Sequence, residues 1–367
     1  MPVNPAEGTS YLLPSLPSQA RLLILRLRSI GDIILLTPAL RLVKDWRPDL
    51  RLSVMVESRF RELLEGNPNV EEILHPGEGR GWSKIVARYR ALRELRKRQF
   101  ALCLNLHGGP TSALLTQASG AKRKAGFAHF RRRRIYSILI PDARDILNQP
   151  SIHTAEHQAS AFFYLGLPRR EIPRAELFVS PLHGTWWGEK RARLGLEASQ
   201  GYAVIHPTAL YPTKQWAPER FAQLGAYLER EVKLKPLYAC GPGESGLLEE
   251  VERAAGARIA RLDGASLGQY AAAMAGARLF VGNDSGPAHM AAALGRPSVV
   301  LFGSSSSDIW GPWPRSGNTR VVQNFYECNP CPGDRCYRFE RPECILSVTF
   351  EQVREAVDAV LEKSRAA

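Results

Sequence analysis

The sequence predicts an α/β protein built from two successive halves, each organised around a parallel β-sheet. Short continuous apolar runs alternate with segments of helical periodicity, which is typical of strands buried on both faces and joined by helices. The same alternation restarts after Trp187. At 367 residues the chain is too long for one ordinary domain and suits two.

In the first half we expect buried strands over residues 21–27, 52–56, 70–74 and 100–106, separated by helices over 33–46, 59–65 and 82–98. The last of these helices is amphipathic, and helical spacing places six large side chains on one face. They are Trp82, Ile85, Val86, Tyr89, Leu92 and Leu95.

In the second half we expect strands over residues 202–206, 237–240, 278–282 and 297–302, with helices over 218–231, 246–255, 267–275, 287–294 and 350–363. The resulting division is a flexible tail (1–20), a first domain (21–180), a second domain (188–349) and a C-terminal helix (350–367).

The bulk composition limits the compartment and the partners. No apolar run approaches the roughly 20 residues needed to span a bilayer, and the N-terminus lacks a signal-peptide pattern, so we expect a cytoplasmic protein. The formal net charge is +13. Between Arg80 and Arg134 the chain carries 15 Lys and Arg against one acid, Glu94, a net +14, and the remainder is close to neutral. One basic face on a neutral body indicates an anionic partner: nucleic acid, an anionic membrane surface or a phosphorylated acceptor. A solvated basic helix without a partner is the alternative.

The stretch from Val281 to Pro297 predicts a phosphate site. An apolar strand leads into Asn283–Gly286, which has no bulky side chain, and a helix follows with Pro287 in its first turn. Free backbone N–H groups and the positive end of a helix dipole hold anions at such a turn. The pattern favours an enzyme acting on a phosphorylated or nucleotide-linked small molecule.

Polar residues follow several other predicted strands. Asp32, His107, the loop after His206, the Gly241 turn and Asp284 all take this position. Ligands of parallel sheets bind beyond the carboxyl ends of the strands. Two halves facing one another would bring these loops into one cleft.

Three motifs, in order and at matching spacing, resemble the lipopolysaccharide heptosyltransferases of glycosyltransferase family 9. They are Arg28–Leu40, Lys214–Phe221 and Gly282–His289. The resemblance implies the GT-B architecture, two facing Rossmann-like domains with the ligand cleft between them. It further implies transfer of L-glycero-D-manno-heptose, with inversion, from ADP-heptose bound by the second domain to the lipopolysaccharide inner core (Kdo or heptose) bound by the first.

The family places its catalytic base in the first motif, so the resemblance makes Asp32 the base; the alternative is a helix N-cap. The resemblance implies that Lys214 contacts the donor phosphates; the alternative is an ordinary surface lysine. It also implies that Glu244 contacts the ribose; the alternative is an acidic residue that stabilises the start of a helix. Thr208 offers a hydroxyl to the same phosphates. A non-catalytic relative is disfavoured because Asp32, Lys214 and Asp284 are all retained.

In the third motif Asp284 is expected to hold hydroxyls of the heptose, while Ser285 and Gly286 offer N–H groups to the phosphate. His289 either assists them or packs in the core. There is no Asp-x-Asp pair, so no metal-bridged pyrophosphate is expected, and the reaction needs no cofactor.

The acceptor candidates are cations of the first half. They are Arg59, Arg61, Lys122, Arg123, Lys124, Arg131, Arg132, Arg133 and Arg134. Such residues would attract both the anionic core acceptor and the inner face of the cytoplasmic membrane, making the protein peripheral there. A nucleic-acid partner is disfavoured, since the basic stretch lacks interleaved exposed aromatics and no helix-turn-helix or zinc finger is present. Another nucleotide-sugar or glycan acceptor is the alternative within the class.

The cysteines divide into two groups. Cys103 and Cys240 lie in apolar strands and are expected to be inert. Four others are closely spaced, Cys328, Cys331, Cys336 and Cys344. Structural zinc and reduced or redox-active thiols both fit this spacing, and the sequence leaves the choice open.

Overall fold

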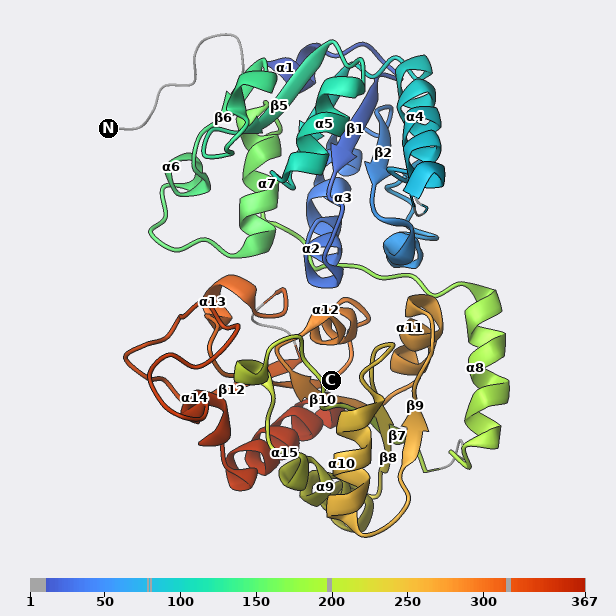
Figure 1. The fold of residues 1–367 in the computed structure, drawn as a ribbon, viewed down its shortest axis with the longest axis vertical. Coiled ribbons are helices and arrows are strands. Elements are labelled where there is room, and N and C mark those ends of the chain that lie inside the picture. Colours follow the sequence, from blue (N-terminus) through green and yellow to red (C-terminus); the bar gives the residue numbers. More distant parts are fainter. Residues whose placement is uncertain (1–10, 78, 80, 197–199, 315–317, 367) are drawn as a thin grey trace. The chain divides into compact units, whose positions relative to one another are not determined.

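The computed structural model describes residues 11–77, 79, 81–196, 200–314 and 318–366, and the chain divides into two compact units, Met1–Glu176 and Leu177–Ala367. Each unit is an α/β structure with one six-stranded sheet, and all neighbouring strands are parallel (Figure 1). The predicted fold class is confirmed. Among the described residues no helix is both long and apolar enough to cross a bilayer.

The sheet of the first unit has the strand order β3-β2-β1-β4-β5-β6. The strands are β1 (Arg21–Leu25), β2 (Arg51–Met55), β3 (Glu72–Leu74), β4 (Leu102–Asn105), β5 (Arg123–Phe127) and β6 (Ile138–Ile140). The helices are α1 (Leu12–Ser15), α2 (Ile30–Ile34), α3 (Thr37–Trp46), η1 (Ser58–Leu63), α4 (Gly81–Lys97), α5 (Pro110–Ala118), η2 (Arg133–Ile135), α6 (Ala143–Leu147) and α7 (Thr154–Tyr164).

The sheet of the second unit has the order β12-β11-β10-β7-β8-β9. The strands are β7 (Tyr202–His206), β8 (Lys235–Ala239), β9 (Ala260–Leu262), β10 (Leu279–Asn283), β11 (Ser298–Phe302) and β12 (Thr319–Gln323). The helices are α8 (Pro181–Arg193), η3 (Pro212–Lys214), α9 (Pro218–Tyr227), η4 (Leu228–Val232), α10 (Ser245–Ala255), α11 (Leu267–Ala275), α12 (Gly286–Ala293), α13 (Ser307–Trp310), α14 (Glu343–Leu346) and α15 (Phe350–Ala366).

Both sheets therefore have the same Rossmann order. In each, the first and fourth strands of the unit are neighbours, and the chain leaves them toward opposite edges of the sheet. This switch point lies between β1 and β4 in the first unit and between β7 and β10 in the second. Open α/β sheets bind ligands beyond the carboxyl ends of the strands at this point.

The cores consist of the central strands and the helices that cover them. In the first unit Leu23 and Leu25 of β1 pack with Leu95 of α4 and Leu115 of α5. In the second unit Val281 of β10 belongs to a cluster that reaches α9 and α15. Strands buried on both faces have no alternating pattern, which is why their sequences are uniformly apolar.

Four strands were not predicted: β5, β6, β9 and β12. Each lies at or next to a sheet edge, is only three to five residues long, and three of them contain Arg. The predicted helix over 33–46 is divided into α2 and α3, and Pro38 lies in the first turn of α3, where its missing N–H costs no helical hydrogen bond.

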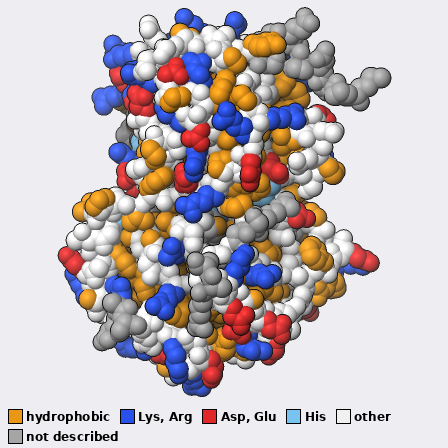
Figure 2. All heavy atoms as spheres, turned by 180° about the vertical axis from the view of Figure 1, so that it is seen from behind, with side chains coloured by type: hydrophobic (Ala, Val, Ile, Leu, Met, Phe, Trp, Pro, Cys, Tyr) orange, Lys and Arg blue, Asp and Glu red, His pale blue; other side chains and the backbone are white. Residues whose placement is uncertain are grey.

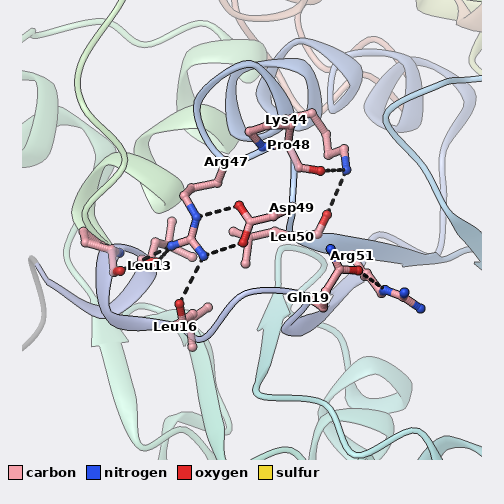
Figure 3. Close-up of polar contacts among 10 residues, drawn as sticks. Leu13, Leu16, Gln19, Lys44, Arg47, Pro48, Asp49, Leu50 and Arg51 are labelled. Atoms are coloured by element: carbon pink, nitrogen blue, oxygen red, sulfur yellow. Dashed lines mark hydrogen bonds and ion pairs between the residues drawn. The ribbon is translucent and has the colours of Figure 1, made fainter.

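Residues 11–20 are not a loose tail. Leu13 is fully buried, its N–H donates to Leu165 O (2.9 Å), and the guanidinium of Arg47 donates to the carbonyls of Leu13 and Leu16 (both 3.1 Å; Figure 3). Asp49 accepts two further hydrogen bonds from Arg47, which hold the pKa of that carboxyl below its usual range. The prediction of a flexible tail is wrong for these residues, while residues 1–10 lie outside the described part of the chain.

The predicted basic face is also divided. Lys122–Lys124 lie at the amino end of β5, whereas Arg131–Arg134 follow its carboxyl end, so the length of the strand separates the two groups. Arg98 and Lys97 are paired with Glu72 and Glu94 (2.6 and 2.7 Å). On the face that Figure 2 shows, acidic and basic side chains are mixed. Arg80 lies outside the described residues.

Candidate active site

The switch point of the first unit carries Asp32. The loop after β1 leads directly into α2, and Asp32 is in the first turn of that helix. Its Oδ2 accepts hydrogen bonds from the backbone N–H and the hydroxyl of Ser29 (3.2 and 3.1 Å), and Oδ1 forms an ion pair with Arg26. The side chain is 15% exposed. The N-cap alternative for Asp32 is wrong, because Ser29 is the N-cap of α2 and Asp32 is the third residue of the helix. Its carboxylate is held at the helix start by Ser29 and Arg26 and is only partly exposed.

A cavity of about 460 Å³ opens beside this switch point, beyond the carboxyl ends of β1, β2, β3 and β4. The charged or titratable residues that line it are Arg28, Glu57, Arg59, Arg88 and His107. Glu57 is paired with Arg59 (2.8 Å). Among the described residues, no hydrogen-bond partner faces the buried Nε of Arg88. The cavity thus has more cations than acids and suits an anionic group.

His107 follows β4 at the same switch point and lines this cavity. Burial lowers the pKa of its imidazole, and the nearby charges of Arg26 and Arg28 lower it further. A neutral imidazole at neutral pH can accept a hydrogen bond from a hydroxyl.

The predicted acceptor cations occupy different places. Arg59 lines the cavity, while Arg61 pairs with Glu65 (2.8 Å) on the exposed surface of η1. Arg131–Arg134 are exposed in the loop after the carboxyl end of β5. The structure does not bring Lys122, Arg123 and Lys124 together with Asp32, because they lie at the opposite, amino edge of the sheet.

The switch point of the second unit carries a buried ion pair. Lys214, at the end of η3, contacts Asp284 with an Nζ–Oδ2 distance of 2.6 Å. Ser305 also donates to Asp284 Oδ2. The side chains of Lys214 and Asp284 are 22% and 6% exposed, so the lysine ends at the site rather than in bulk solvent.

A second carboxylate, Glu244, is fixed on the other side of β7. It accepts hydrogen bonds from the backbone N–H of Gly241 (2.9 Å) and the hydroxyl of Thr208 (2.6 Å). Since Thr208 gives its only hydroxyl proton to Glu244, the 3.0 Å contact with His206 requires His206 Nε2–H to donate. Tyr270 O–H then donates to Nδ1 (3.1 Å), which leaves a neutral histidine. Burial agrees with the neutral form, because it lowers the pKa of His206 to about 4.

The strand, the turn and the helix on which the phosphate prediction rests are present. Ser285 precedes α12, Pro287 lies in its first turn, and Ser285 Oγ donates to Asn283 O (3.1 Å). Ser285 and Gly286 are partly exposed, whereas His289 is buried on α12. The first N–H groups of α12 are thus on the same strand end as the Lys214–Asp284 pair.

The four clustered cysteines line one apolar cavity of about 210 Å³, together with Thr213 and Ser304. All four are free thiols, and burial raises the pKa of Cys344 to about 11. No group of three or more His, Cys, Asp or Glu in the described part of the chain is arranged to hold a metal ion. Cys103 and Cys240 are buried, as expected.

Several site residues were missed by the sequence analysis. Arg26, Arg28, Arg88 and Ser305 line or complete the two switch points. Arg26 and Arg28 had a usable signal, because they flank the end of the first apolar strand just as Asp32 does. Ser305 had none, since it meets Asp284 only through the pairing of β10 with β11.

Two Rossmann-type units with polar groups at both switch points form the two-domain architecture of GT-B glycosyltransferases. Residues 88–338 match glycosyltransferase family 9 (heptosyltransferase), and the chain belongs to this family of glycosyltransferases.

Relatives agree with this assignment over most of the chain. Lipopolysaccharide heptosyltransferase 3 of Escherichia coli (strain K12) is 26% identical, over 91% of this chain and 96% of the relative. A family 9 glycosyltransferase from Veillonella parvula has a similar fold, with a TM-score of 0.79, 23% identity and coverage of 94% of this chain and 98% of that one. The E. coli ADP-heptose lps heptosyltransferase II has a TM-score of 0.75 at 20% identity, covering 94% and 99%.

Proposed function

We propose that this protein transfers L-glycero-D-manno-heptose from ADP-heptose to the anionic inner core (Kdo or heptose) of lipopolysaccharide, with inversion at the anomeric carbon. Family membership and the names of the relatives support the substrate class. In this proposal the second unit binds the donor and the first unit binds the acceptor.

Asp32 is the proposed general base, and its position at the β1 switch point is the observation that carries the proposal. The acceptor hydroxyl oxygen attacks the anomeric carbon while its proton passes to the Asp32 carboxylate. The bond between that carbon and the phosphate oxygen breaks, and ADP leaves with the electron pair. Ser29 and Arg26 hold the carboxylate in place, which reduces the reorganisation needed in the transition state.

The second unit supplies stabilisation of the leaving group. Lys214 and the N–H groups of Ser285 and Gly286 would meet the growing negative charge on ADP. Asp284 accepts hydroxyls of the sugar, and Glu244 accepts those of the ribose, with Thr208 beside it. His289 supports the turn from its buried position on α12.

The cavity lined by Arg28, Arg59 and Arg88 is the proposed subsite for an anionic group of the acceptor. A Kdo carboxylate or a core phosphate would satisfy the buried Nε of Arg88 and balance the excess of cations. Arg131–Arg134 are the candidates for contacts farther along the acceptor.

The test is to incubate the purified chain with ADP-heptose and Kdo₂-lipid A and to follow the acceptor by mass spectrometry, beside Asp32→Asn. One added heptose, absent with the variant, is the expected result. UDP- and GDP-sugars serve as donor controls, and transfer from one of these instead of ADP-heptose would contradict the donor assignment. A nucleic-acid function has no supporting feature of comparable strength.

A further inference from the structure

The exposed face of helix α4 combines aromatic and basic side chains. Trp82 and Tyr89 are 81% and 68% exposed, and Val86 is 43% exposed. Trp82, Val86 and Tyr89 were predicted to share one face of an amphipathic helix with Leu92 and Leu95. Only the C-terminal part of that face is buried, since Leu95 is 2% exposed and Leu92 packs against the same core cluster. The side chain of Ile85 lies outside the described residues.

Helical geometry explains the division. At 100° per residue, Arg88, Leu92 and Leu95 follow one another on one side of α4. Trp82, Val86, Tyr89, Arg93 and Lys97 form a stripe on the other side, apolar at its N-terminal end and cationic at its C-terminal end. We call these five residues the α4 stripe.

Apolar exposure in the first unit is concentrated here. Among its described residues, six large apolar side chains are exposed: Tyr11, Trp82, Val86, Tyr89, Leu114 and Leu139. Three of them belong to α4 and a fourth, Leu114, to α5, which packs beside α4 (Figure 1). Exposed aromatic side chains gathered on one helix mark an interaction surface rather than scattered surface apolarity.

The positive charge of α4 favours an anionic partner for the stripe. Helix α4 contains six Lys and Arg against one acid, Glu94, and that acid is already paired with Lys97 (2.7 Å). Arg90, Arg93 and Arg96 are exposed as well. Trp and Tyr with Lys and Arg on one helix match the boundary between acyl chains and anionic headgroups of a bilayer.

We propose that the α4 stripe docks the protein onto an anionic lipid surface. The helix lies in the interface with Trp82 and Tyr89 among the headgroups and upper acyl chains, while its cations contact lipid phosphates. The docking is peripheral, in keeping with a helix that carries charge along most of its length.

The other side of the same helix reaches the cavity of the first unit. Arg88 lines that cavity, and Gly77 (φ +81°) lies so close to α4 that an added Cβ would be 2.6 Å from the Ala87 backbone. Gly77, after β3, is therefore packed closely against α4. This step rests on the proposed function: docking through α4 would then present a lipid-anchored acceptor to Arg88.

The docking is tested by co-sedimentation of the full chain with sized vesicles of phosphatidylglycerol and phosphatidylethanolamine, or of phosphatidylcholine alone. We expect binding to the anionic vesicles that weakens with added salt, and little binding to phosphatidylcholine. Trp82→Ser/Tyr89→Ser should reduce the partition coefficient about 10-fold or more. The matched control is Trp310→Ser/Tyr337→Ser in the second unit, where the two side chains are 42% and 59% exposed.

Equal vesicle binding by the α4 variant and the wild type would overturn the proposal, as would an equal loss in the control. If the protein bound an RNA oligonucleotide but not vesicles, the partner of the α4 stripe would be nucleic acid and the lipid proposal would be wrong. Transfer to a de-acylated, water-soluble acceptor separates docking from function. The rate of this transfer should be the same in the α4 variant and the wild type. If the wild type did not transfer heptose to the soluble acceptor, the result would contradict the proposed reaction and not the docking.

Discussion

The two units share one strand order but differ at their switch points. In the second unit each carboxylate has short-range partners inside the protein: Asp284 has Lys214 and Ser305, and Glu244 has Thr208 and Gly241. In the first unit the switch point opens into a cavity of about 460 Å³ with an excess of cations. The same strand order therefore carries a charge-balanced site in one unit and a basic cavity in the other.

This difference shows that loops, not sheet topology, set the chemistry of each site. The balanced pair in the second unit keeps a lysine near the turn proposed to bind phosphate, and the lysine charge is paired with Asp284. The unbalanced cavity in the first unit leaves its cations for a ligand. The proposed function places the donor in the second unit and the acceptor in the first. The following predictions test whether the two switch points differ in this way.

The largest effect is expected for Asp32→Asn. Removing the general base should lower kcat about 1,000-fold while leaving ADP affinity, measured by calorimetry, nearly unchanged. Asp142→Asn is the matched control, because Asp142 also begins a helix in the first unit and accepts from Arg144 N–H (2.9 Å). If Asp32→Asn had near-normal turnover, Asp32 would not be the general base and would only stabilise the start of α2.

Lys214→Ala should weaken ADP binding itself, by roughly 30-fold, because a charge-assisted contact to phosphate is lost. Lys235→Ala, which removes an exposed lysine of the same unit paired with Glu229, should leave the ADP dissociation constant unchanged. If ADP bound Lys214→Ala as tightly as the wild type, the donor would have to be assigned elsewhere.

The buried histidine of the second unit predicts a stability that depends on pH. The pKa of His206 is about 4 in the folded protein, below its ordinary value, so the unfolded chain takes up a proton first as the pH falls. Stability is present above about pH 6.5 and is lost toward pH 4, by about 2 kcal/mol at pH 5. Urea unfolding of His206→Gln should show a weaker loss between pH 7 and pH 5. An unchanged pH dependence would mean that other groups dominate.

The smallest effect concerns the cavity of the first unit. Arg88→Gln should raise the acceptor KM about 5- to 10-fold and leave the donor KM unchanged. Neutralising Lys122, Arg123 and Lys124 together should change the acceptor KM less than twofold, since these residues lie at the opposite edge of the sheet. The reverse order of effects would move the acceptor site away from the switch point.

The central elements could be predicted from the sequence because their signal is local. Strands such as β1, β7 and β10 are apolar throughout, and α11 has the predicted bounds, Leu267–Ala275. The edge strands β9 and β12 were missed because few buried side chains define them. Edge pairing depends on backbone hydrogen bonds to a neighbour far along the chain, which composition does not reveal.

The site was predicted in part for the same reason. Thr208 and Asp284 directly follow apolar strands, and Asp32 lies in the short helix that comes after β1, so their place at a carboxyl edge is a local property. The pairing of Lys214 with Asp284 joins residues 70 positions apart, and the ion pair of Arg26 with Asp32 depends on how α2 turns back to β1. The exposure of Trp82 and Tyr89 likewise depends on which side of α4 meets the sheet.

The class of fold, the repetition of the parallel α/β pattern in two halves and the strand ends at which polar residues gather could all be predicted from the sequence. These follow from apolar runs and turn residues, which act over a few positions. The folded structure was needed to show which cations share a cavity, which are paired with a carboxylate and which aromatic side chains are exposed to solvent. Burial and ion pairing are set by segments distant in sequence, and so they exist only once the chain has folded.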